Sequence, residues 1–143
     1  MIILLKKSTD ELMNEINQSN NIDKYLKDNS EYMLDRGLSD ILESIIDKKG
    51  LKKSLVIKKA EISEVYGYQI FSGVKKPLRD KLLSICIAME LTLEETQDVL
   101  KHGSFALLYP KNKRDSIIIY GINNNLSVCE INNLLYDKNE DTL

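Results

Sequence analysis

The sequence contains few prolines, glycines and aromatic residues. Its 143 residues include two prolines, six glycines, two phenylalanines and no tryptophan. Because proline breaks a helix interior and glycine weakens one, their scarcity leaves long stretches free to form helices. Apolar residues recur at helical spacing nearly throughout, so we predict an all-α protein. With 43% hydrophobic and 29% charged residues, the composition is typical of a globular domain large enough to bury one core.

Histidine and cysteine are scarce as well, which argues against a metal centre or a hydrolytic enzyme. Cys86 and Cys129 are 43 residues apart, and both fall in apolar runs that predict buried free thiols. His102, the single histidine, falls at a predicted helix end, where we expect a solvated side chain. The sequence also lacks a Gly-rich phosphate loop after a strand and a nucleophile elbow. We therefore expect no enzymatic activity, no cofactor and no bound metal.

Long apolar runs are absent. The opening segment MIILLKK has only four apolar residues after the initiator, which is too short for a signal peptide or a membrane-spanning helix. We therefore expect a cytoplasmic protein with no membrane partner.

Positive charge is concentrated in the middle of the chain. The net charge is −2, but residues 1–37 carry −2, residues 38–81 carry +4 and residues 82–143 carry −4. Because the basic residues gather on one segment, that segment suits a polyanion better than the sequence pI of 5.5 implies.

Helix-capping residues and apolar spacing divide the chain into three parts. Residues 1–37 form an acidic N-terminal helical arm, and residues 38–102 form a five-helix domain. Residues 103–143 form a C-terminal helical hairpin. The five helices of the middle part are expected at about 38–49, 53–60, 64–72, 77–89 and 92–101.

The C-terminal hairpin repeats residues 79–102 at an offset of 35 residues. Arg79-Asp80 recurs as Arg114-Asp115, and the capping box Thr92–Glu95 recurs as Ser127–Glu130. Polar identities match as well as apolar ones, which favours a structural repeat over a chance alignment of two amphipathic helix pairs. Helices are therefore expected near 114–124 and 127–136.

The first three helices of the middle part have the pattern of a helix-turn-helix. Several residues fall in a characteristic order along this segment: Leu51, Val56, Ile62-Ser63, Ile70, Gly73, Lys76-Pro77, Leu82, Ile85, Met89, Leu91-Thr92 and Glu95. Through these positions, residues 38–100 resemble the Xre-type, phage-repressor-like helix-turn-helix family. The resemblance implies a compact five-helix domain that binds double-stranded DNA, usually as a homodimer on a near-palindromic operator.

The resemblance assigns base reading to the start of helix 64–72. Gln69 can pair with adenine, Glu64 can accept from the cytosine amine and Val65 can contact a thymine methyl group. For Tyr68, packing and a hydrogen bond to phosphate remain equal alternatives. Contacts that position the DNA backbone are expected from Lys52, Lys53, Ser63, Tyr68, Lys75, Lys76 and Arg79.

Several positions, Glu64 among them, depart from the family pattern. Gly67 stands where the family usually has a buried aliphatic residue, and it costs about 1 kcal/mol of helix propensity. We expect Gly67 to let helix 64–72 approach helix 53–60 closely. Glu61 and Glu90 occupy turn positions where the family prefers glycine, and Lys52 replaces an oxygen-bearing N-cap residue.

The sequence predicts a sequence-specific, DNA-binding transcriptional regulator of bacterial type that places helix 64–72 in the major groove. The alternative is a protein-interaction adaptor on the same scaffold, without specific DNA binding, in which the tyrosine-rich helix docks a protein partner. The acidic pI and Glu64 at the front of the reading helix favour this alternative.

Overall fold

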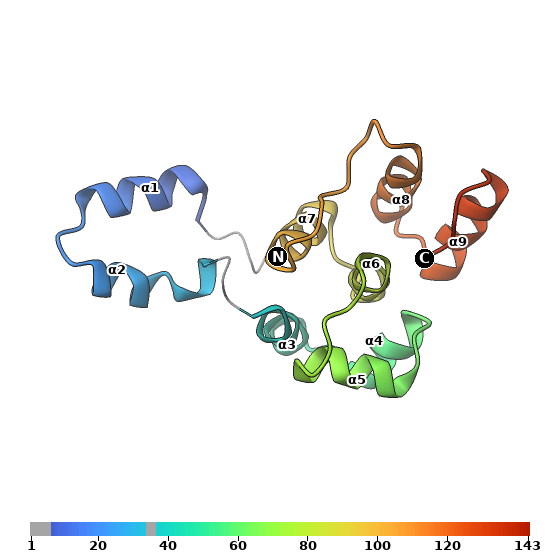
Figure 1. Cartoon of the computed structure of the whole chain (residues 1–143), viewed down its shortest axis with the longest axis horizontal. Coiled ribbons are helices and arrows are strands. Elements are labelled where there is room, and N and C mark those ends of the chain that lie inside the picture. Colours follow the sequence, from blue (N-terminus) through green and yellow to red (C-terminus); the bar gives the residue numbers. More distant parts are fainter. Residues whose placement is uncertain (1–6, 34–36) are drawn as a thin grey trace.

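The computed structural model of the chain describes residues 7–33 and 37–143, so the apolar opening at residues 1–6 lies outside it. In the described residues the protein is all-helical and has no strand, which confirms that it is all-α (Figure 1). A short 3-10 helix, Ser30–Tyr32, follows the second helix. No helix in this part of the chain is long and apolar enough to cross a membrane. The α-helices are α1 (Thr9–Gln18), α2 (Ile22–Asp28), α3 (Leu38–Lys49), α4 (Lys53–Lys59), α5 (Glu64–Ser72), α6 (Arg79–Ala88), α7 (Leu93–His102), α8 (Lys113–Asn123) and α9 (Val128–Asp137).

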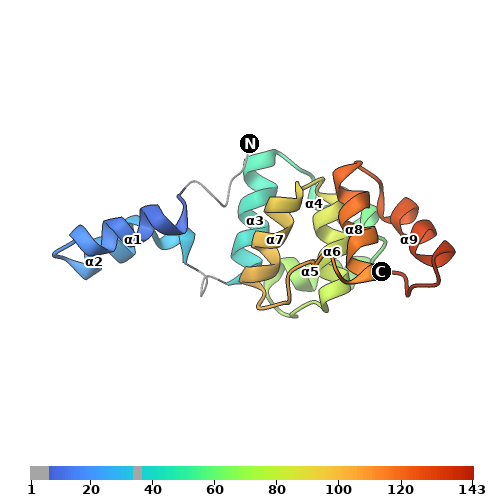
Figure 2. The same ribbon diagram turned by 90° about the horizontal axis from the view of Figure 1, so that it is seen from above.

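Helices α1 and α2 form a small hairpin beside the main body of the molecule (Figures 1 and 2). Lys7 ties the hairpin together, because its Nζ donates to Glu15 Oε2 at 2.6 Å and to Asn29 Oδ1 at 2.9 Å. Neither helix has a buried residue. Four large apolar side chains of the hairpin are consequently exposed: Met13, Ile16, Ile22 and Leu26.

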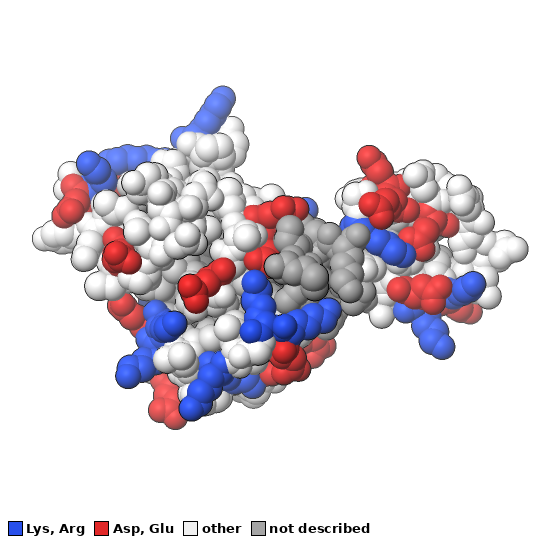
Figure 3. Space-filling model, turned by 180° about the vertical axis from the view of Figure 1, so that it is seen from behind, with Lys and Arg blue, Asp and Glu red and all other residues white. Residues whose placement is uncertain are grey.

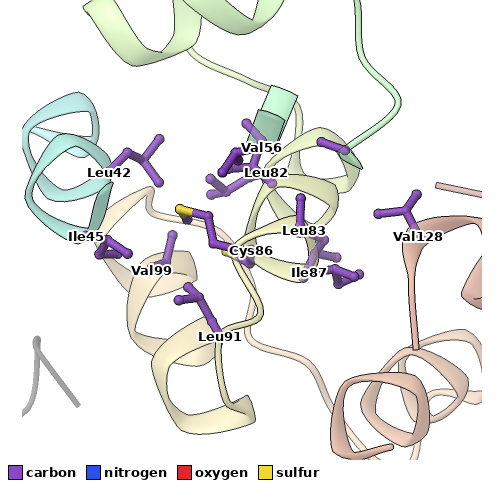
Figure 4. Close-up of a cluster of buried hydrophobic side chains, with 14 of the residues drawn as sticks. Leu42, Ile45, Val56, Leu82, Leu83, Cys86, Ile87, Leu91, Val99 and Val128 are labelled. Atoms are coloured by element: carbon purple, nitrogen blue, oxygen red, sulfur yellow. The ribbon is translucent and has the colours of Figure 1, made fainter. Parts of the chain in front are cut away.

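Helix α6 runs through the centre of the main body. Its residues from Leu82 to Ala88 are all buried, as expected for a helix that is surrounded by other helices. The Cys86 side chain points toward Ile45 of α3 and Val99 of α7, while Val128 of α9 lies on the other side of α6 (Figure 4). Complete burial is worth about 1.5–3 kcal/mol for each large aliphatic side chain, so packing around α6 dominates the stability of the body.

Local signals set the ends of α5 and α7 where the sequence predicted them. Ser63 Oγ accepts a hydrogen bond from the Tyr66 N–H at 3.2 Å, and Gly73 ends α5 with a φ of 84°. Thr92 and Glu95 form the expected capping box at the start of α7. These contacts satisfy backbone groups that a helix end otherwise leaves unpaired.

Two turns hold a glutamate in the left-handed region that usually takes glycine. Glu61, between α4 and α5, has a φ of 59°, and Glu90, between α6 and α7, has a φ of 57°. A residue with a Cβ pays about 1–2 kcal/mol for this conformation. The packing of the helices on either side therefore has to hold both turns in place.

Gly67 allows α5 to pack closely against α4, as the sequence predicted. A Cβ at this position would lie 2.6 Å from Cγ2 of Ile57 on α4, well inside normal contact distance. The second helix pair uses the same device, because a Cβ at Gly121 of α8 would overlap Ile131 of α9. Both close approaches depend on the missing side chain.

The helix ends and turns of α6–α7 recur in α8–α9 at the 35-residue offset. Helix α9 begins and ends 35 residues after α7, and both begin with a capping box. The residues with a positive φ recur at the same offset. Glu90 corresponds to Asn125, and Ser104 corresponds to Asn139. The helices thus lie where the repeat predicts them, although the division of the chain into three domains stays a prediction.

The repeat extends beyond α7 and α9 into the segments that follow them. Arg79 donates to the carbonyl oxygens of residues 106 and 107, and Arg114 donates to those of residues 141 and 142. The Leu108 N–H donates to Gln97 Oε1 at 2.8 Å, and the Leu143 N–H donates to the equivalent Asn132 Oδ1 at 2.7 Å. Each arginine thereby ties a non-helical segment to its own helix pair.

The two helix pairs are joined by reciprocal ion pairs. Arg79 reaches Asp115 of the second copy at 3.2 Å, and Arg114 reaches Asp80 of the first copy at 2.9 Å. The hydrogen bond from Arg114 to Asp80 also raises the pKa of the Arg114 guanidinium. Helix packing is reciprocal too, because α6 contacts α9 and α7 contacts α8. Such exchange of equivalent contacts is the pattern of a two-fold interface within one chain.

Two side chains lie differently from the sequence prediction. His102, expected to be solvated, is buried because it follows Glu95 and Val99 on the inward face of α7. Cys129, expected to be buried, is exposed, whereas Cys86 is buried as predicted. Cys129 was predicted to be buried because its neighbours in the sequence are apolar. In the structure the adjacent Val128 occupies the inward position at the start of α9.

Replacing Gly67 by alanine should destabilise the protein although alanine is the better helix former. The gain of about 1 kcal/mol in helix propensity is outweighed by overpacking against Ile57, for a net loss of about 1–2 kcal/mol. Urea unfolding followed by circular dichroism measures the difference. The loss should shrink in an Ile57→Ala background, where the colliding side chain is absent. Equal or greater stability of Gly67→Ala in the native background would contradict the close approach.

The two reciprocal ion pairs should differ in strength because they differ in burial. The Asp115 side chain is 9% exposed and Asp80 is 38% exposed. Asp115→Ala should cost about 2–3 kcal/mol, since it removes the pair with the half-buried Arg79 and also the acceptor of the Tyr109 N–H, which donates to Asp115 Oδ2 at 3.1 Å. Asp80→Ala should cost less, about 1 kcal/mol, because the more exposed Asp80 carboxylate is partly solvated in the folded protein and Arg114 keeps its hydrogen bonds to two carbonyl oxygens. Equal losses in urea unfolding would mean that burial does not govern these contacts.

Candidate nucleic-acid interface

Helix α5 turns one face into the core and the other to solvent. Gly67, Ile70 and Phe71 are its buried residues, and the helix packs against α3 and α4. On the other face Glu64 and Tyr68 are exposed, and Val65 is 69% exposed. An exposed valine at the start of a well-capped helix has no role in the core. The outward face of α5, defined here by Glu64, Val65, Tyr68 and the half-buried Gln69, is therefore free to meet a partner.

Exposed lysines lie at both ends of the α4–α5 unit. Lys52 precedes α4, and Lys75 and Lys76 lie in the loop that follows α5. The ammonium group of Lys76 sits 5.0 Å from the ring centroid of Phe105, which gives its flexible side chain a preferred position. These three cations can approach a polyanion without breaking an ion pair, because no salt bridge holds them in the described residues.

Two basic residues of the predicted set are already engaged. The Arg79 guanidinium binds Asp115 and the carbonyl oxygens of Ala106 and Leu107, so it serves the junction between the helix pairs. Lys53 pairs with Glu43 and lies 5.5 Å from the ring centroid of Phe71. Lys53 can turn toward a phosphate by exchanging Glu43, whereas Arg79 would have to abandon four hydrogen bonds.

Ser63 and Tyr66 hold the local structure in place. Ser63 Oγ caps α5, although its hydroxyl proton remains available for donation. The Tyr66 hydroxyl accepts from the Leu78 N–H at 3.4 Å, and its ring packs against the core. Tyr66 is thus a packing residue. The exposed Tyr68 has a free surface for either of its two predicted roles.

The charge on this side of the molecule is mixed. Figure 3 shows Lys and Arg side chains gathered along the lower edge of the main body, where Figure 1 places α3, α4 and α5. Asp and Glu side chains lie between them, so the view does not present one continuous positive surface. Such a surface can attract a polyanion, but discrimination has to come from individual side chains.

The sequence reasoning missed the exposed apolar residues near α5. Val74 and Leu78, in the loop between α5 and α6, are each 71% exposed, and Leu55 of α4 is also exposed. Their signal was present, because Val74 and Leu78 flank the lysines in a segment without helical periodicity. This loop therefore presents apolar as well as basic side chains to solvent.

In the described residues no group of three His, Cys, Asp or Glu side chains is placed to hold a metal ion. No family model, curated protein or solved structure matches the chain.

Proposed function

We propose that the protein is a sequence-specific, DNA-binding transcriptional regulator. In this proposal α4 and α5 act as a repressor-like helix-turn-helix, with α5 in the major groove of double-stranded DNA. The observation that carries the proposal is the outward face of α5, which follows the cap at Ser63 and has exposed side chains at three of its four positions. It is flanked by exposed lysines that no salt bridge holds in the described residues. Helix α3 packs behind α5 and keeps that face rigid.

The roles of the side chains follow from their chemistry and exposure. Glu64, Val65 and Gln69 contact base edges, since a carboxylate, a methyl-bearing side chain and an amide suit cytosine, thymine and adenine respectively. Lys52, Lys75 and Lys76 contact phosphates at the two ends of the unit, with Ser63, Lys53 and Tyr68 beside them. We leave Arg79 out of this set because its guanidinium joins the two helix pairs.

The regulator acts as a homodimer in this proposal. Two copies of α5 must reach successive major grooves, about 34 Å apart, to read a near-palindromic operator. The hairpin of α1 and α2 offers surface for self-association, because its large apolar side chains are exposed. It is not needed for the core formed by α3 to α9.

Replacing Lys75 and Lys76 by alanine should weaken binding to every duplex alike. Each lysine neutralises one phosphate and releases its counterions, so the slope of log affinity against log salt should fall by about two. Fluorescence anisotropy at several salt concentrations measures this slope. Lys58→Ala/Lys59→Ala is the matched control, since this exposed pair at the end of α4 lies outside the proposed contacts. An equal fall in the control would mean that the effect is general electrostatics.

Replacing Gln69 by alanine should affect specificity and leave non-specific binding nearly unchanged. The loss of a bidentate contact to adenine should cost about 1–3 kcal/mol on the cognate site. Titration of fragments from the upstream region of the protein's own gene, against random duplex, gives both affinities. If no fragment binds better than random duplex, the regulator proposal is wrong.

A protein-interaction adaptor is the second candidate function. The specific observation that favours it is that the apolar side chains of Val65, Val74 and Leu78 are largely exposed to solvent. Contacts with phosphates and base edges do not require so much exposed apolar surface. In an adaptor, Tyr68 and Gln69 would contact a protein partner. If mutation of Tyr68 abolishes binding to a purified partner protein, and the protein binds no duplex specifically, the adaptor is the correct function.

A further inference from the structure

An exposed patch of apolar and basic side chains is formed by the loop between α5 and α6 and the segment after α7. The two segments lie side by side, because the Arg79 guanidinium donates to the carbonyl oxygens of residues 106 and 107 at 2.9 and 3.3 Å. Val74 and Leu78 are each 71% exposed. We call this surface the loop patch and define it by Val74, Lys75, Lys76, Leu78 and Leu107.

A hollow of about 430 Å³ borders the loop patch. It opens between the start of α3, the loop after α5 and the end of α7. Leu38, Ile70 and Pro77 give it apolar walls, and the two lysines of the loop patch stand at the same place. The surface therefore offers apolar contacts, a concavity and two cations to a partner.

The hairpin of α1 and α2 has no core of its own. Helix α1 has 10 residues and α2 has seven, and neither has a buried residue. Helices of this length are marginal in isolation, and in the described residues these two pack mainly against each other. Met13 and Ile16 share one face of α1, and Ile22 and Leu26 share one face of α2. The hairpin thus presents exposed apolar faces that packing on another surface would bury.

The charge of the hairpin complements that of the loop patch. Residues 7–33 carry three basic and six acidic side chains, a net charge of −3. Asp10 and Asp23 each lie three positions before an exposed apolar residue, Met13 and Leu26, so carboxylates flank the apolar faces. In the part of the chain that the structure describes, no salt bridge holds these two aspartates or the two lysines of the loop patch. Opposite charges beside apolar surface favour association of the two.

The hairpin is attached to the body next to the loop patch. A Cβ at Gly73 would lie 2.9 Å from Ser39 Oγ, so the end of α5 touches the first turn of α3. Helix α3 is the element that follows the hairpin in the chain. The hairpin nevertheless stands beside the main body rather than on it (Figures 1 and 2). Because hairpin attachment and patch are neighbours, two copies related by a two-fold axis can each place a hairpin on the other.

We propose that the loop patch binds the α1–α2 hairpin of a second copy of this chain, so that two copies exchange hairpins in a closed dimer. The apolar faces of the hairpin cover Val74, Leu78 and the hollow. The flanking carboxylates pair with Lys75 and Lys76. The dimer covers two lysines that are assigned to phosphates above. It is therefore a DNA-free form of the regulator, and this consequence rests on the proposed function.

Two full-length variants test the exchange by complementation. Met13→Ser/Leu26→Ser removes apolar contacts of the hairpin, and Val74→Ser/Leu78→Ser removes those of the loop patch. All four residues are exposed, so both variants should fold, which circular dichroism checks. In analytical ultracentrifugation the native chain should dimerise, and each variant alone should dimerise at least about tenfold more weakly. An equimolar mixture should form a heterodimer, because one hairpin and one patch remain intact.

Other modes of association give different results in the same experiment. If the hairpins pair with each other, Val74→Ser/Leu78→Ser will dimerise like the native chain, and the proposal is wrong. A native chain that stays monomeric at high concentration, or a mixture that forms no heterodimer, would overturn it as well.

A charge exchange tests the pairing of carboxylates with lysines. Lys75→Glu/Lys76→Glu should abolish the dimer at moderate salt, and adding Asp10→Lys/Asp23→Lys to the same chain should restore it. Lys58→Glu/Lys59→Glu, an exposed pair outside the loop patch, is the matched control and should leave dimerisation unchanged. Equal effects of the two lysine pairs, or a failure of the restoring change, would contradict the proposed contact.

Duplex DNA separates this interface from the proposed regulator. Met13→Ser/Leu26→Ser should bind random duplex more tightly than the native chain, because its lysines are no longer covered. Equal affinities would mean that the hairpin does not cover the loop patch. A heterodimer of the two serine variants without any specific duplex binding would keep the interface and reject the regulator. Specific duplex binding without a heterodimer would do the reverse.

Discussion

The contact between Gly67 and Ile57 is the constraint on which the α4–α5 unit depends. Because Gly67 has no side chain, the axis of α5 lies close to α4, and the buried face of α5 can also reach α3. This packing fixes which residues of α5 face outward. The same glycine weakens the isolated helix, so α5 depends on its neighbours for stability. A rigid outward face is what recognition of a base edge requires.

The second helix pair completes the core of the main body. Helices α8 and α9 cover α6 and α7 through equivalent contacts that are exchanged between the two copies. The two arginines take part in this exchange and also hold the segments after α7 and α9. Arg79 is thus engaged at the junction between the helix pairs, although its sequence position beside Lys75 and Lys76 suggested a contact with DNA. The proposed reading unit, α4 and α5, is therefore part of a body that the second helix pair helps to stabilise.

The sequence predicted features that are set by neighbouring residues. The bounds of helix 64–72 and the two capping boxes depend on contacts within four residues of the chain, and each is found as predicted. Features that depend on distant packing were harder to predict. His102 is buried because α7 packs against α3, and Arg79 is engaged because residue 115 lies beside it in space.

The most direct test of the central claim is a selection of duplexes from a random pool by the full chain at moderate salt. The proposed regulator should enrich one near-palindromic sequence, with half-sites about one helical turn apart. Selection with Gln69→Ala should relax the preference at one position in each half-site and retain the spacing. Recovery of a pool with no enriched sequence would contradict the claim that α5 reads DNA.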